Sequence, residues 1–261
     1  MTDGPVWRWL GTAASFALFG LGGIVLGCLV LPLARIVPMG AGRRQRFARW
    51  IISRGFRGFI ECMRLAGVLS YEFTGRERLG RAGQLIIANH PSLIDVVFLI
   101  GFTPAPCCVV KAALWRNPVT EHALASARYI PNQPTDTMIE AAGAALEADN
   151  TLIIFPEGTR SVPGQPLQFH RGAAVVALRA ARSLTPVHIT VNPTTLTKQE
   201  PWYRIPVRRP HFALHVGDDV DLDIFRHQAA IPMAGRALNA HLLRLFEAGP
   251  ATPLAGTGSA L

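Results

Sequence analysis

The chain has 261 residues, of which 49% are hydrophobic, and its formal net charge is +9. This length accommodates one well-buried domain with a short additional element and is too short for two full domains. An apolar, basic chain suits an anionic membrane surface. Nucleic acid is not expected as a partner, because the basic residues cluster directly after a hydrophobic segment. A nucleic-acid-binding chain would spread them along a groove with interleaved aromatic residues.

The first predicted element is an apolar helix near the N-terminus. No charged residue lies between Arg8 and Arg35, and residues 10–34 are long enough to cross a bilayer. A cleaved signal peptide is the alternative, but it would have a shorter apolar core and a more basic start. The segment therefore predicts a transmembrane or deeply inserted helix, with membrane lipids as its partners.

The charges that flank this helix predict its orientation. Two charged residues, Asp3 and Arg8, precede it. Positive charge accumulates on the cytoplasmic side of membrane helices, so we expect the rest of the chain on the cytoplasmic face of the cell (inner) membrane. The arginines that follow the helix are Arg35, Arg43, Arg44, Arg46 and Arg49.

Residues 43–65 predict a basic amphipathic helix. Arginines alternate there with aromatic and aliphatic residues at spacings of three and four, which is the period of a helix with one apolar face. Such a helix can lie in the headgroup layer of a membrane, although an ordinary surface helix packed on a domain shows the same pattern. The apolar segment before it favours the membrane, so residues 1–67 are expected to form a membrane anchor and an interfacial helix.

From Tyr71 onward, short apolar runs alternate with helical stretches. This alternation is typical of the α/β class, here a single domain with a largely parallel mixed sheet flanked by helices. The domain is expected over residues 68–248, and a flexible tail over 249–261. The predicted strands are 84–88, 107–110, 152–155, 186–191 and 211–216, and the predicted helices are 92–101, 137–148, 172–181 and 233–248.

A histidine and an aspartate follow the first of these strands, in the sequence NHPSLID (residues 89–95). Positions i and i+5 lie roughly 140° apart on an α-helix, so His90 and Asp95 can meet only if His90 is still in the preceding loop. Asp95 would then accept a hydrogen bond from one ring nitrogen and leave the other free to take a proton. The pair is a candidate general base, and a structural histidine in a loop is the alternative.

A second polar segment, FPEGTRS (residues 155–161), follows another apolar strand. Gly158 permits a tight turn. Arg160 can bind a phosphate or carboxylate through its planar guanidinium, and Glu157 can hold that arginine or an acceptor hydroxyl. A turn with a local ion pair is the simpler alternative.

Together, NHPSLID and FPEGTRS, about 65 residues apart, resemble the first and third sequence blocks of the glycerolipid acyltransferases, the lysophosphatidic acid acyltransferase family. The resemblance extends from about Gln84 to Asn192. It implies an O-acyltransferase that moves a fatty acyl group from acyl-CoA or acyl carrier protein to a lipid hydroxyl, with a 1-acylglycerol-3-phosphate-type lysophospholipid as the expected acceptor. It also implies that the reaction needs no cofactor, no metal and no acyl-enzyme intermediate.

The resemblance implies a role for each matching residue. His90 corresponds to the base and Asp95 to its charge partner, and Lys111 corresponds to a lysine beside the acceptor phosphate. The acceptor-binding block comprises Glu157, Gly158, Thr159 and Arg160, and two further matches are the turn glycine Gly172 and Pro186 of the fourth block.

The second block departs from the family pattern. Members with a phosphate-bearing acceptor carry an arginine where this chain has Asn132, and the nearby Arg128 is the candidate substitute. Other acceptors therefore stay open: a lyso-ornithine lipid, a glycolipid or a polyene head group. A membrane lipid-binding scaffold without catalysis is a further alternative, against which the intact His90 and Asp95 argue.

Other chemistries lack their sequence signals. The chain contains neither a GxSxG nucleophile elbow nor the GK pair of a phosphate-binding loop. Its cysteines do not have the spacing of zinc ligands; they are Cys28, Cys62, Cys107 and Cys108.

Overall fold

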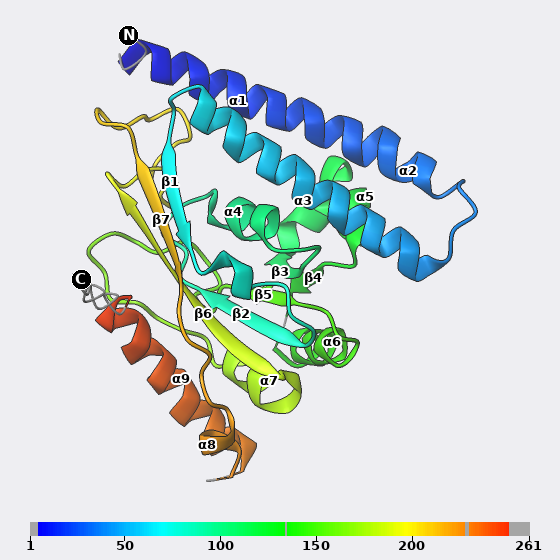
Figure 1. Cartoon of the computed structure of the whole chain (residues 1–261), viewed down its shortest axis with the longest axis vertical. Helices are drawn as coiled ribbons and strands as arrows, with labels where there is room; N and C mark the ends of the chain where they lie inside the picture. Colours follow the sequence, from blue (N-terminus) through cyan, green and yellow to red (C-terminus); the bar gives the residue numbers. More distant parts are fainter. Residues whose placement is uncertain (1–4, 134, 228–229, 251–261) are drawn as a thin grey trace, which may run out of the picture.

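A seven-stranded sheet forms the centre of the molecule (Figure 1). The computed structural model describes residues 5–133, 135–227 and 230–250. The strand order is β1-β7-β6-β2-β5-β3-β4, and neighbouring strands are parallel except for the antiparallel pair β6 and β7. The strands are β1 (Ser70–Thr74), β2 (Gln84–Ala88), β3 (Cys107–Lys111), β4 (Ile130–Asn132), β5 (Leu152–Ile154), β6 (Ser183–Asn192) and β7 (His211–Val216).

Helices cover both faces of the sheet (Figure 1). α3 packs against α4 and α5 on one face, and α7 packs against α6 and α9 on the other. Because parallel strands are joined by right-handed crossovers, connections that run in opposite directions along the sheet place their helices on opposite faces. The helices are α1 (Pro5–Val25), α2 (Leu31–Ala34), α3 (Ala41–Leu65), α4 (Asp95–Phe102), α5 (Pro118–Ala127), α6 (Thr135–Glu147), α7 (Gly172–Ala180), α8 (Asp223–Arg226) and α9 (Ile231–Ala248), with a π-helical segment at Leu26–Val30 and 3₁₀ turns at Arg76–Arg78 and Ala112–Arg116.

The central strands are buried on both sides. Every residue of β2 and β5 is buried, which explains their continuous apolar sequences, since parallel strands covered by helices have no hydrated face. The fully buried Phe98 of α4 and Leu146 of α6 show that both helical layers contribute to this core.

The predicted fold class is confirmed. The predicted strands 84–88 and 211–216 coincide with β2 and β7, and the other predicted strands and helices overlap their counterparts. α4 begins at Asp95, three residues later than the predicted helix 92–101. β1, β4 and α5 have no counterpart in the prediction. Of the tail expected at 249–261, residues 251–261 lie outside the described part of the chain.

α1 and α3 form an antiparallel hairpin along one side of the domain (Figure 1). The rings of Phe16 and Phe19 in α1 lie 5.7 and 4.5 Å from that of Phe59 in α3. α3 in turn packs on α4 and places Ile60 in the main hydrophobic core. The boundary expected at residue 67 therefore falls between segments that share one core.

The outer face of this hairpin is apolar and exposed. Val6–Ala34 is long and apolar enough to cross a membrane, with a mean hydropathy of 2.4, and 11% of its apolar window is buried. The helix nevertheless contacts the domain at both ends. The Arg8 guanidinium donates to the Val207 carbonyl, and Gly27 lies against the carbonyl oxygen of Val119 in α5. It thus lies along the domain instead of projecting from it.

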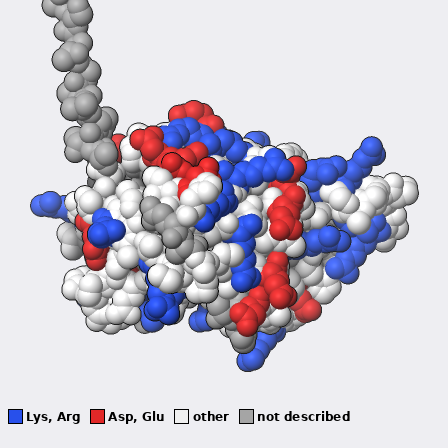
Figure 2. Space-filling model, turned by 90° about the horizontal axis from the view of Figure 1, so that it is seen from below, with Lys and Arg blue, Asp and Glu red and all other residues white. Residues whose placement is uncertain are grey.

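The end of the molecule remote from α1 has a different surface. Acidic and basic side chains are interspersed there (Figure 2). Mixed charges of this kind are typical of a hydrated surface. The molecule is therefore polarised, with an apolar side formed by the hairpin and a charged end away from it.

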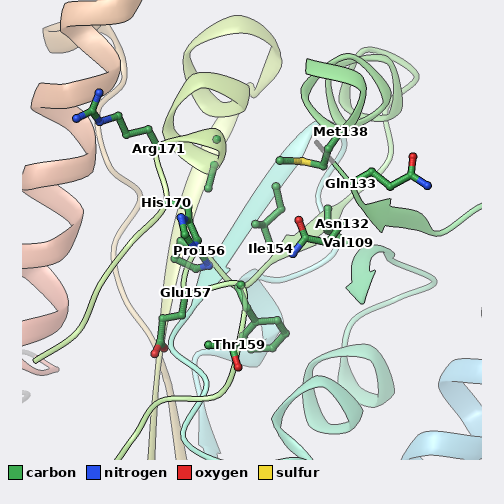
Figure 3. A pocket seen from close by; sticks show the side chains of 14 residues that line it. Val109, Asn132, Gln133, Met138, Ile154, Pro156, Glu157, Thr159, His170 and Arg171 are labelled. Carbon is green, nitrogen blue, oxygen red and sulfur yellow. The ribbon is translucent and has the colours of Figure 1, made fainter. Parts of the chain in front are cut away.

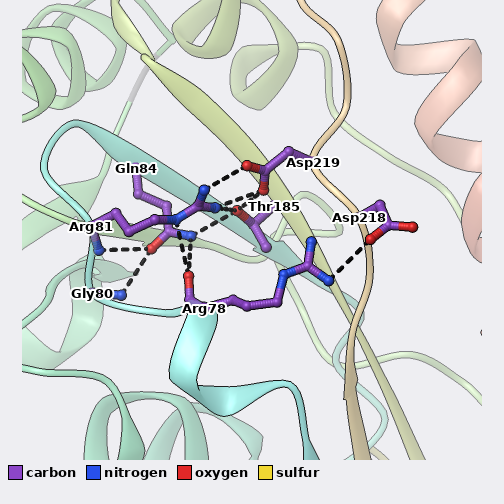
Figure 4. Close-up of polar contacts among 7 residues, drawn as sticks. All are labelled: Arg78, Gly80, Arg81, Gln84, Thr185, Asp218 and Asp219. Atoms are coloured by element: carbon purple, nitrogen blue, oxygen red, sulfur yellow. Dashed lines mark hydrogen bonds and ion pairs between the residues drawn. The ribbon is translucent and has the colours of Figure 1, made fainter.

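A polar network joins the amino ends of β2 and β6 to the segment after β7 (Figure 4). Arg81 donates two hydrogen bonds of 2.7 Å to Asp219 and one of 2.9 Å to Thr185. Thr185 and Gln84 are fully buried, and the Gln84 side-chain N–H donates to the Thr185 hydroxyl oxygen at 2.7 Å. Burial acts to raise the pKa of Asp219, but its hydrogen bonds with Arg81 and Thr185 outweigh this and hold the pKa below its ordinary value.

Candidate active site

The carboxyl ends of β2 and β5 lie side by side, and the two polar motifs follow them. Ile87 of β2 is in register with Ile154 of β5. His90 and Glu157 each lie three residues beyond this pair, so both loops leave the sheet at the same level. This register brings the motifs together at the edge where parallel sheets usually carry their sites.

His90 and Asp95 form the expected pair. His90 Nδ1 lies 2.9 Å from Asp95 Oδ2. Because α4 begins only at Asp95, His90 is in the loop, as the spacing required. The Ser92 N–H donates to the same carboxylate oxygen at 2.6 Å. A carboxylate accepts hydrogen bonds, so Nδ1 carries the proton and Nε2 is the basic ring nitrogen.

The two members of the pair differ in exposure. The Asp95 side chain is fully buried, whereas 16% of the His90 side chain is exposed. Burial raises the pKa of Asp95, and its hydrogen bonds with His90 and Ser92 act in the opposite direction. Its second oxygen, Oδ1, is buried and has no hydrogen-bond partner among the described residues. A buried carboxylate beside a reachable imidazole orients the ring and stabilises the imidazolium that forms when Nε2 takes a proton.

The second motif positions the backbone of His90. The His90 N–H donates to Glu157 Oε1 at 2.8 Å, and the His90 carbonyl accepts from the Ser161 N–H at 2.8 Å. The Ser161 hydroxyl donates to the same Glu157 oxygen at 2.9 Å. The His90 ring packs on Phe155, with the ring centroids 4.4 Å apart. Four separate contacts therefore fix the imidazole and its loop.

Asn89 is a positioning residue to which the sequence analysis gave no role. Its side-chain amide exchanges two hydrogen bonds of 2.8 Å with the backbone of Ile189 in β6. The backbones of β2 and β6 pair as far as Ala88. The Asn89 amide then takes the place of the next peptide group, which lets the chain leave the sheet at His90. The available signal was an asparagine directly after a buried strand.

Glu157 and Arg160 do not form a local ion pair, so that interpretation of the motif is wrong. Glu157 accepts from the loop of His90, as described above. Arg160 Nη1 instead donates to the carbonyl oxygens of Leu196 and Thr197, at 2.9 and 2.8 Å. Its Nε and Nη2 make no hydrogen bond with the described residues, which leaves these donors for a ligand.

A cleft of about 630 Å³ opens beside this motif (Figure 3). Its volume is within the range of pockets that bind small organic ligands. His90 is not itself a lining residue, but its ring packs on Phe155, which is one. The polar side chains around it are those of Asn132, Gln133, Glu157, Thr159, His170 and Arg171, of which Arg171 points away from Asn132 and Glu157 in Figure 3.

Gly158 keeps the turn and the cleft open. Its φ is +65°, which glycine adopts more readily than other residues. A Cβ atom at this position would lie 3.2 Å from the ring of His170. Both the backbone conformation and the space therefore require glycine here, as the motif predicted.

Asn132 lines the cleft from β4, and Lys111 lies beside it on the neighbouring strand β3. They end β4 and β3 and are in register with each other. Asn132 lines the cleft, so the position at which phosphate-acceptor members carry an arginine faces the site. Lys111 is exposed, and it shares one face of β3 with the lining residue Val109, because side chains alternate along a strand.

Arg128 is not among the lining residues of this cleft, so the structure gives no support to the prediction that it replaces the missing arginine. It ends α5 just before β4, whereas Asn132 is the last residue of β4. An extended strand rises about 3.3 Å per residue, so the two positions are roughly 13 Å apart along the chain. Arg128 lines a separate pocket with Arg49 and Tyr129. Arg128 and Asn132 are close in sequence but lie apart in space, because β4 runs between them.

The cysteines are free, and Cys107 and Cys108 are buried in β3. Burial raises the pKa of the Cys107 thiol, as expected of cysteines that serve as small apolar side chains. Within the part of the chain that the structure describes, no three His, Cys, Asp or Glu side chains lie close enough together to hold a metal ion.

Residues 70–190 match the model of a protein family described as Acyltransferase. The chain is 30% identical over 125 residues to a 1-acyl-sn-glycerol-3-phosphate acyltransferase from Helicobacter pylori, covering 45% of this chain and 52% of that protein. It is 28% identical over 182 residues to the protein of the same name from Pseudomonas aeruginosa, covering 67% and 69%. The chain thus spans about half the length of the first relative and about two thirds of the second.

These similarities support the resemblance to the glycerolipid acyltransferases that the two motifs indicate. A solved structure supports the fold: the 1-acyl-sn-glycerophosphate acyltransferase from Thermotoga maritima superposes with a TM-score of 0.71 over 97% of this chain and 100% of that one, at 17% sequence identity. The family match begins at the first residue of β1 and includes both motifs of the site.

Proposed function

We propose that this acyltransferase moves a fatty acyl group from an acyl thioester to a hydroxyl group of a lipid acceptor. The observation that carries the proposal is the hydrogen-bonded pair of His90 and Asp95, with the His90 ring packed on Phe155, a lining residue of the cleft. The names of the similar proteins support a 1-acylglycerol-3-phosphate as the acceptor. The donor is acyl-CoA or acyl carrier protein, since both present the same thioester.

In the proposed reaction, Nε2 of His90 takes the proton of the acceptor hydroxyl as its oxygen attacks the thioester carbonyl carbon. The resulting tetrahedral intermediate collapses when the carbon–sulfur bond breaks, and the departing sulfur recovers the proton from the imidazolium. The buried carboxylate of Asp95 stabilises the imidazolium between these two steps. The products are the ester and a free thiol, and His90 returns to its starting state.

The acceptor-binding side of the cleft supports two acceptor classes. Lys111 and the free donors of Arg160 favour a phosphate. Asn132 favours an uncharged or zwitterionic acceptor, such as a lyso-ornithine lipid or a glycolipid, because an amide replaces the arginine of phosphate-acceptor members at a position that faces the cleft. The two classes differ in the acceptor alone and share the chemistry at His90.

The test is acyl transfer by the purified full chain in neutral detergent, with palmitoyl-CoA as donor and lysophosphatidic acid and lyso-ornithine lipid as competing acceptors. We expect His90→Ala to lower the rate by at least about a hundredfold, because general bases contribute roughly 10²–10⁴. His227→Ala, which changes an exposed histidine of the α8 region, is the matched control. Activity of His90→Ala within tenfold of the wild type would contradict the base role.

We also propose that the hairpin lies in one leaflet, parallel to the membrane surface. A helix of 29 residues is about 44 Å long, and its contacts with the domain extend from Arg8 to Gly27. If it crossed the bilayer, those contacts would break or draw the charged domain into the lipid. With the hairpin in plane, its apolar face meets acyl chains while the arginines at the start of α3 meet phosphates.

Reporter fusions distinguish the two arrangements. A reporter fused after Gly67 is expected in the cytoplasm in either case. A reporter placed before Pro5 is expected in the cytoplasm for an in-plane hairpin and on the opposite side for a crossing helix. Detection of the second reporter outside the cytoplasm would exclude the in-plane arrangement.

A further inference from the structure

A second polar pocket lies at the opposite end of the sheet from the cleft. It has a volume of about 360 Å³ and is bounded by α3, β4 and α6. We call it the amino-end pocket, because it lies at the start of β4, whereas the cleft lies at the end of that strand. Small residues of α6 leave it open, and its polar lining residues are Gln45, Arg49, Arg128, Tyr129 and Asn150.

Arg49 brings a buried positive charge to this pocket. It is 3% exposed. Its Nε donates to the carbonyl of Ala127 at 2.8 Å, and its Nη1 donates to Asn150 Oδ1 at 2.5 Å. Both acceptors are neutral, and no carboxylate among the described residues pairs with this guanidinium. A buried charge without a counter-charge is costly, so a bound anion would stabilise it.

Arg128 brings a second guanidinium to the same place. It directly follows Ala127, the residue whose carbonyl holds Arg49. Its own side chain makes no hydrogen bond or ion pair with the described residues. Its backbone adopts the left-handed conformation at the end of α5, with φ +50° and ψ +49°, where glycine is usually found. The chain therefore carries a long basic side chain at a position whose backbone favours glycine.

Tyr129 adds an unused donor. It is 5% exposed, and its hydroxyl is buried without a hydrogen-bond partner in the part of the chain that the structure describes. Burial raises the pKa of Tyr129 well above its ordinary value, so the hydroxyl keeps its proton. Buried hydroxyl groups are normally satisfied, and one that is not calls for a ligand or water as its partner.

We propose that the amino-end pocket binds a phosphate group, held by the guanidinium groups of Arg49 and Arg128 with the Tyr129 hydroxyl as a further donor. Guanidinium groups bind phosphate oxygens in pairs of parallel hydrogen bonds. The group belongs either to the head of an anionic phospholipid or to a free phosphate. The site is distinct from the acceptor cleft and needs no acyl transfer to be occupied.

Two probes distinguish these sources in the full-length protein. The first is inorganic phosphate added to protein in neutral detergent, with sodium chloride at the same ionic strength as the reference. The second is a set of phosphatidylcholine nanodiscs with and without dioleoylphosphatidate. The measurement is the thermal unfolding midpoint as a function of probe concentration, because a ligand that binds the folded state raises this midpoint. No acyl donor is present, so failure of the proposed reaction does not affect the result.

Arg128→Gly is the decisive variant, because glycine suits the left-handed backbone there and the protein should fold normally. We expect it to weaken the response to the effective probe by about tenfold or more, since a lost charged hydrogen bond has this magnitude. Tyr129→Phe should weaken it several-fold. Arg179→Gln, which removes an exposed charge from α7, is the control and should respond like the wild type.

Stabilisation of the wild type by inorganic phosphate, lost in Arg128→Gly, would support a free phosphate site. Stabilisation only by dioleoylphosphatidate, lost in the same variant, would support a lipid headgroup site. Equal responses of the wild type, Arg128→Gly and Tyr129→Phe to both probes would overturn the proposal, and so would the absence of any response by the wild type.

Discussion

The proposed role of His90 as a base depends on the setting that its neighbours provide. Asp95 fixes the ring through Nδ1, and Glu157 and Ser161 fix the backbone on either side. Asn89 ends the pairing of β2 with β6, so that the next residue can leave the sheet. The proposed chemistry resides in one imidazole, but its position depends on hydrogen bonds with α4, with the loop after β5 and with β6.

Asp95→Asn should separate catalysis from stability. An amide can present its N–H₂ group to Nδ1 and stabilise the wrong tautomer, so we expect acyl transfer to fall by about a thousandfold. The substitution also removes a buried carboxylate with one unpaired oxygen, so the unfolding midpoint should stay the same or rise. The check is to measure rate and thermal unfolding on the same preparation. A large loss of stability together with activity would show that Asp95 is mainly structural.

Asn132→Arg tests the acceptor class. The side chain faces the cleft opposite Gly158, so an arginine there would add a charged contact for an acceptor phosphate. We expect the KM for lysophosphatidic acid to fall by about tenfold, while the KM for a lyso-ornithine lipid stays the same or rises. Gln133→Arg, at a neighbouring lining position, is the control for added charge alone. An unchanged KM for lysophosphatidic acid would show that the phosphate lies elsewhere.

At the scale of elements, α3 and α4 cross at Gly101. A Cβ atom at this position would lie 2.9 Å from the backbone nitrogen of Arg57 and 3.2 Å from its Cα. Since these are backbone atoms, they cannot turn aside as a flexible side chain would. Because Gly101 lies near the last residue of α4, α3 can pack closely on that end of the helix and cover the core. Asp95 lies at the first residue of α4, away from this crossing.

Gly101→Ala should therefore be destabilising even though alanine is the better helix former. Overpacking at such a crossing costs roughly 1–3 kcal/mol of unfolding free energy. Gly143→Ala in α6 is the matched control, because its nearest neighbour would be 3.8 Å away and the gain in helix propensity is about 0.5–1 kcal/mol. Chemical unfolding of both variants provides the comparison, and equal stability of the two would contradict the crossing argument.

Elements with a regular local pattern could be predicted from the sequence. β2 is a continuous apolar run and β7 an apolar alternation, and both were predicted to the residue. β4 was missed because it has three residues, one of them Pro131. α5 was missed despite a readable start, in which the Asn117 side chain caps the helix and Pro118 occupies its first turn.

In the site, too, local contacts could be predicted from the sequence and long-range contacts could not. The pairing of His90 with Asp95 depends on five residues of local chain, and the sequence predicted it. The structure gives no support to the predicted placement of Arg128, which depends on β4, the strand that was missed. The partners of Arg160 lie on a loop 36 and 37 residues away, and no local pattern indicates such contacts.

At the scale of the whole molecule, Arg81 and Asp219 join the amino end of β2 to the segment that follows β7. The folded-state pKa of Asp219 is lowered, so this contact stabilises the fold above the unfolded pKa of about 4. The contribution is lost as the pH falls through the lower, folded-state value. Acid should therefore weaken the attachment of the segment after β7.

Asp219→Asn should lower the free energy of unfolding by about 1 kcal/mol at neutral pH, a modest value because the pair is partly exposed. The difference between this variant and the wild type should begin to shrink below about pH 4 and vanish once the pH has fallen past the lower, folded-state pKa of Asp219. Asp218→Asn is the control, since the Asp218 side chain is 99% exposed and makes one contact, with Arg78. A difference that persists undiminished in acid would show that the carboxylate charge is not the cause.

Because α3 packs against both α1 and the domain, the protein cannot be cut into a separate hairpin and domain without exposing apolar residues. One side of the helix receives the phenylalanines of α1, and another completes the interior beside α4. A chain that starts at Val68 would lack part of its own core, and one that starts at Ala41 would present bare aromatic rings to water. Trimming the apolar hairpin is therefore not expected to yield a soluble domain, and we expect the full chain to need a detergent or bilayer from synthesis to assay.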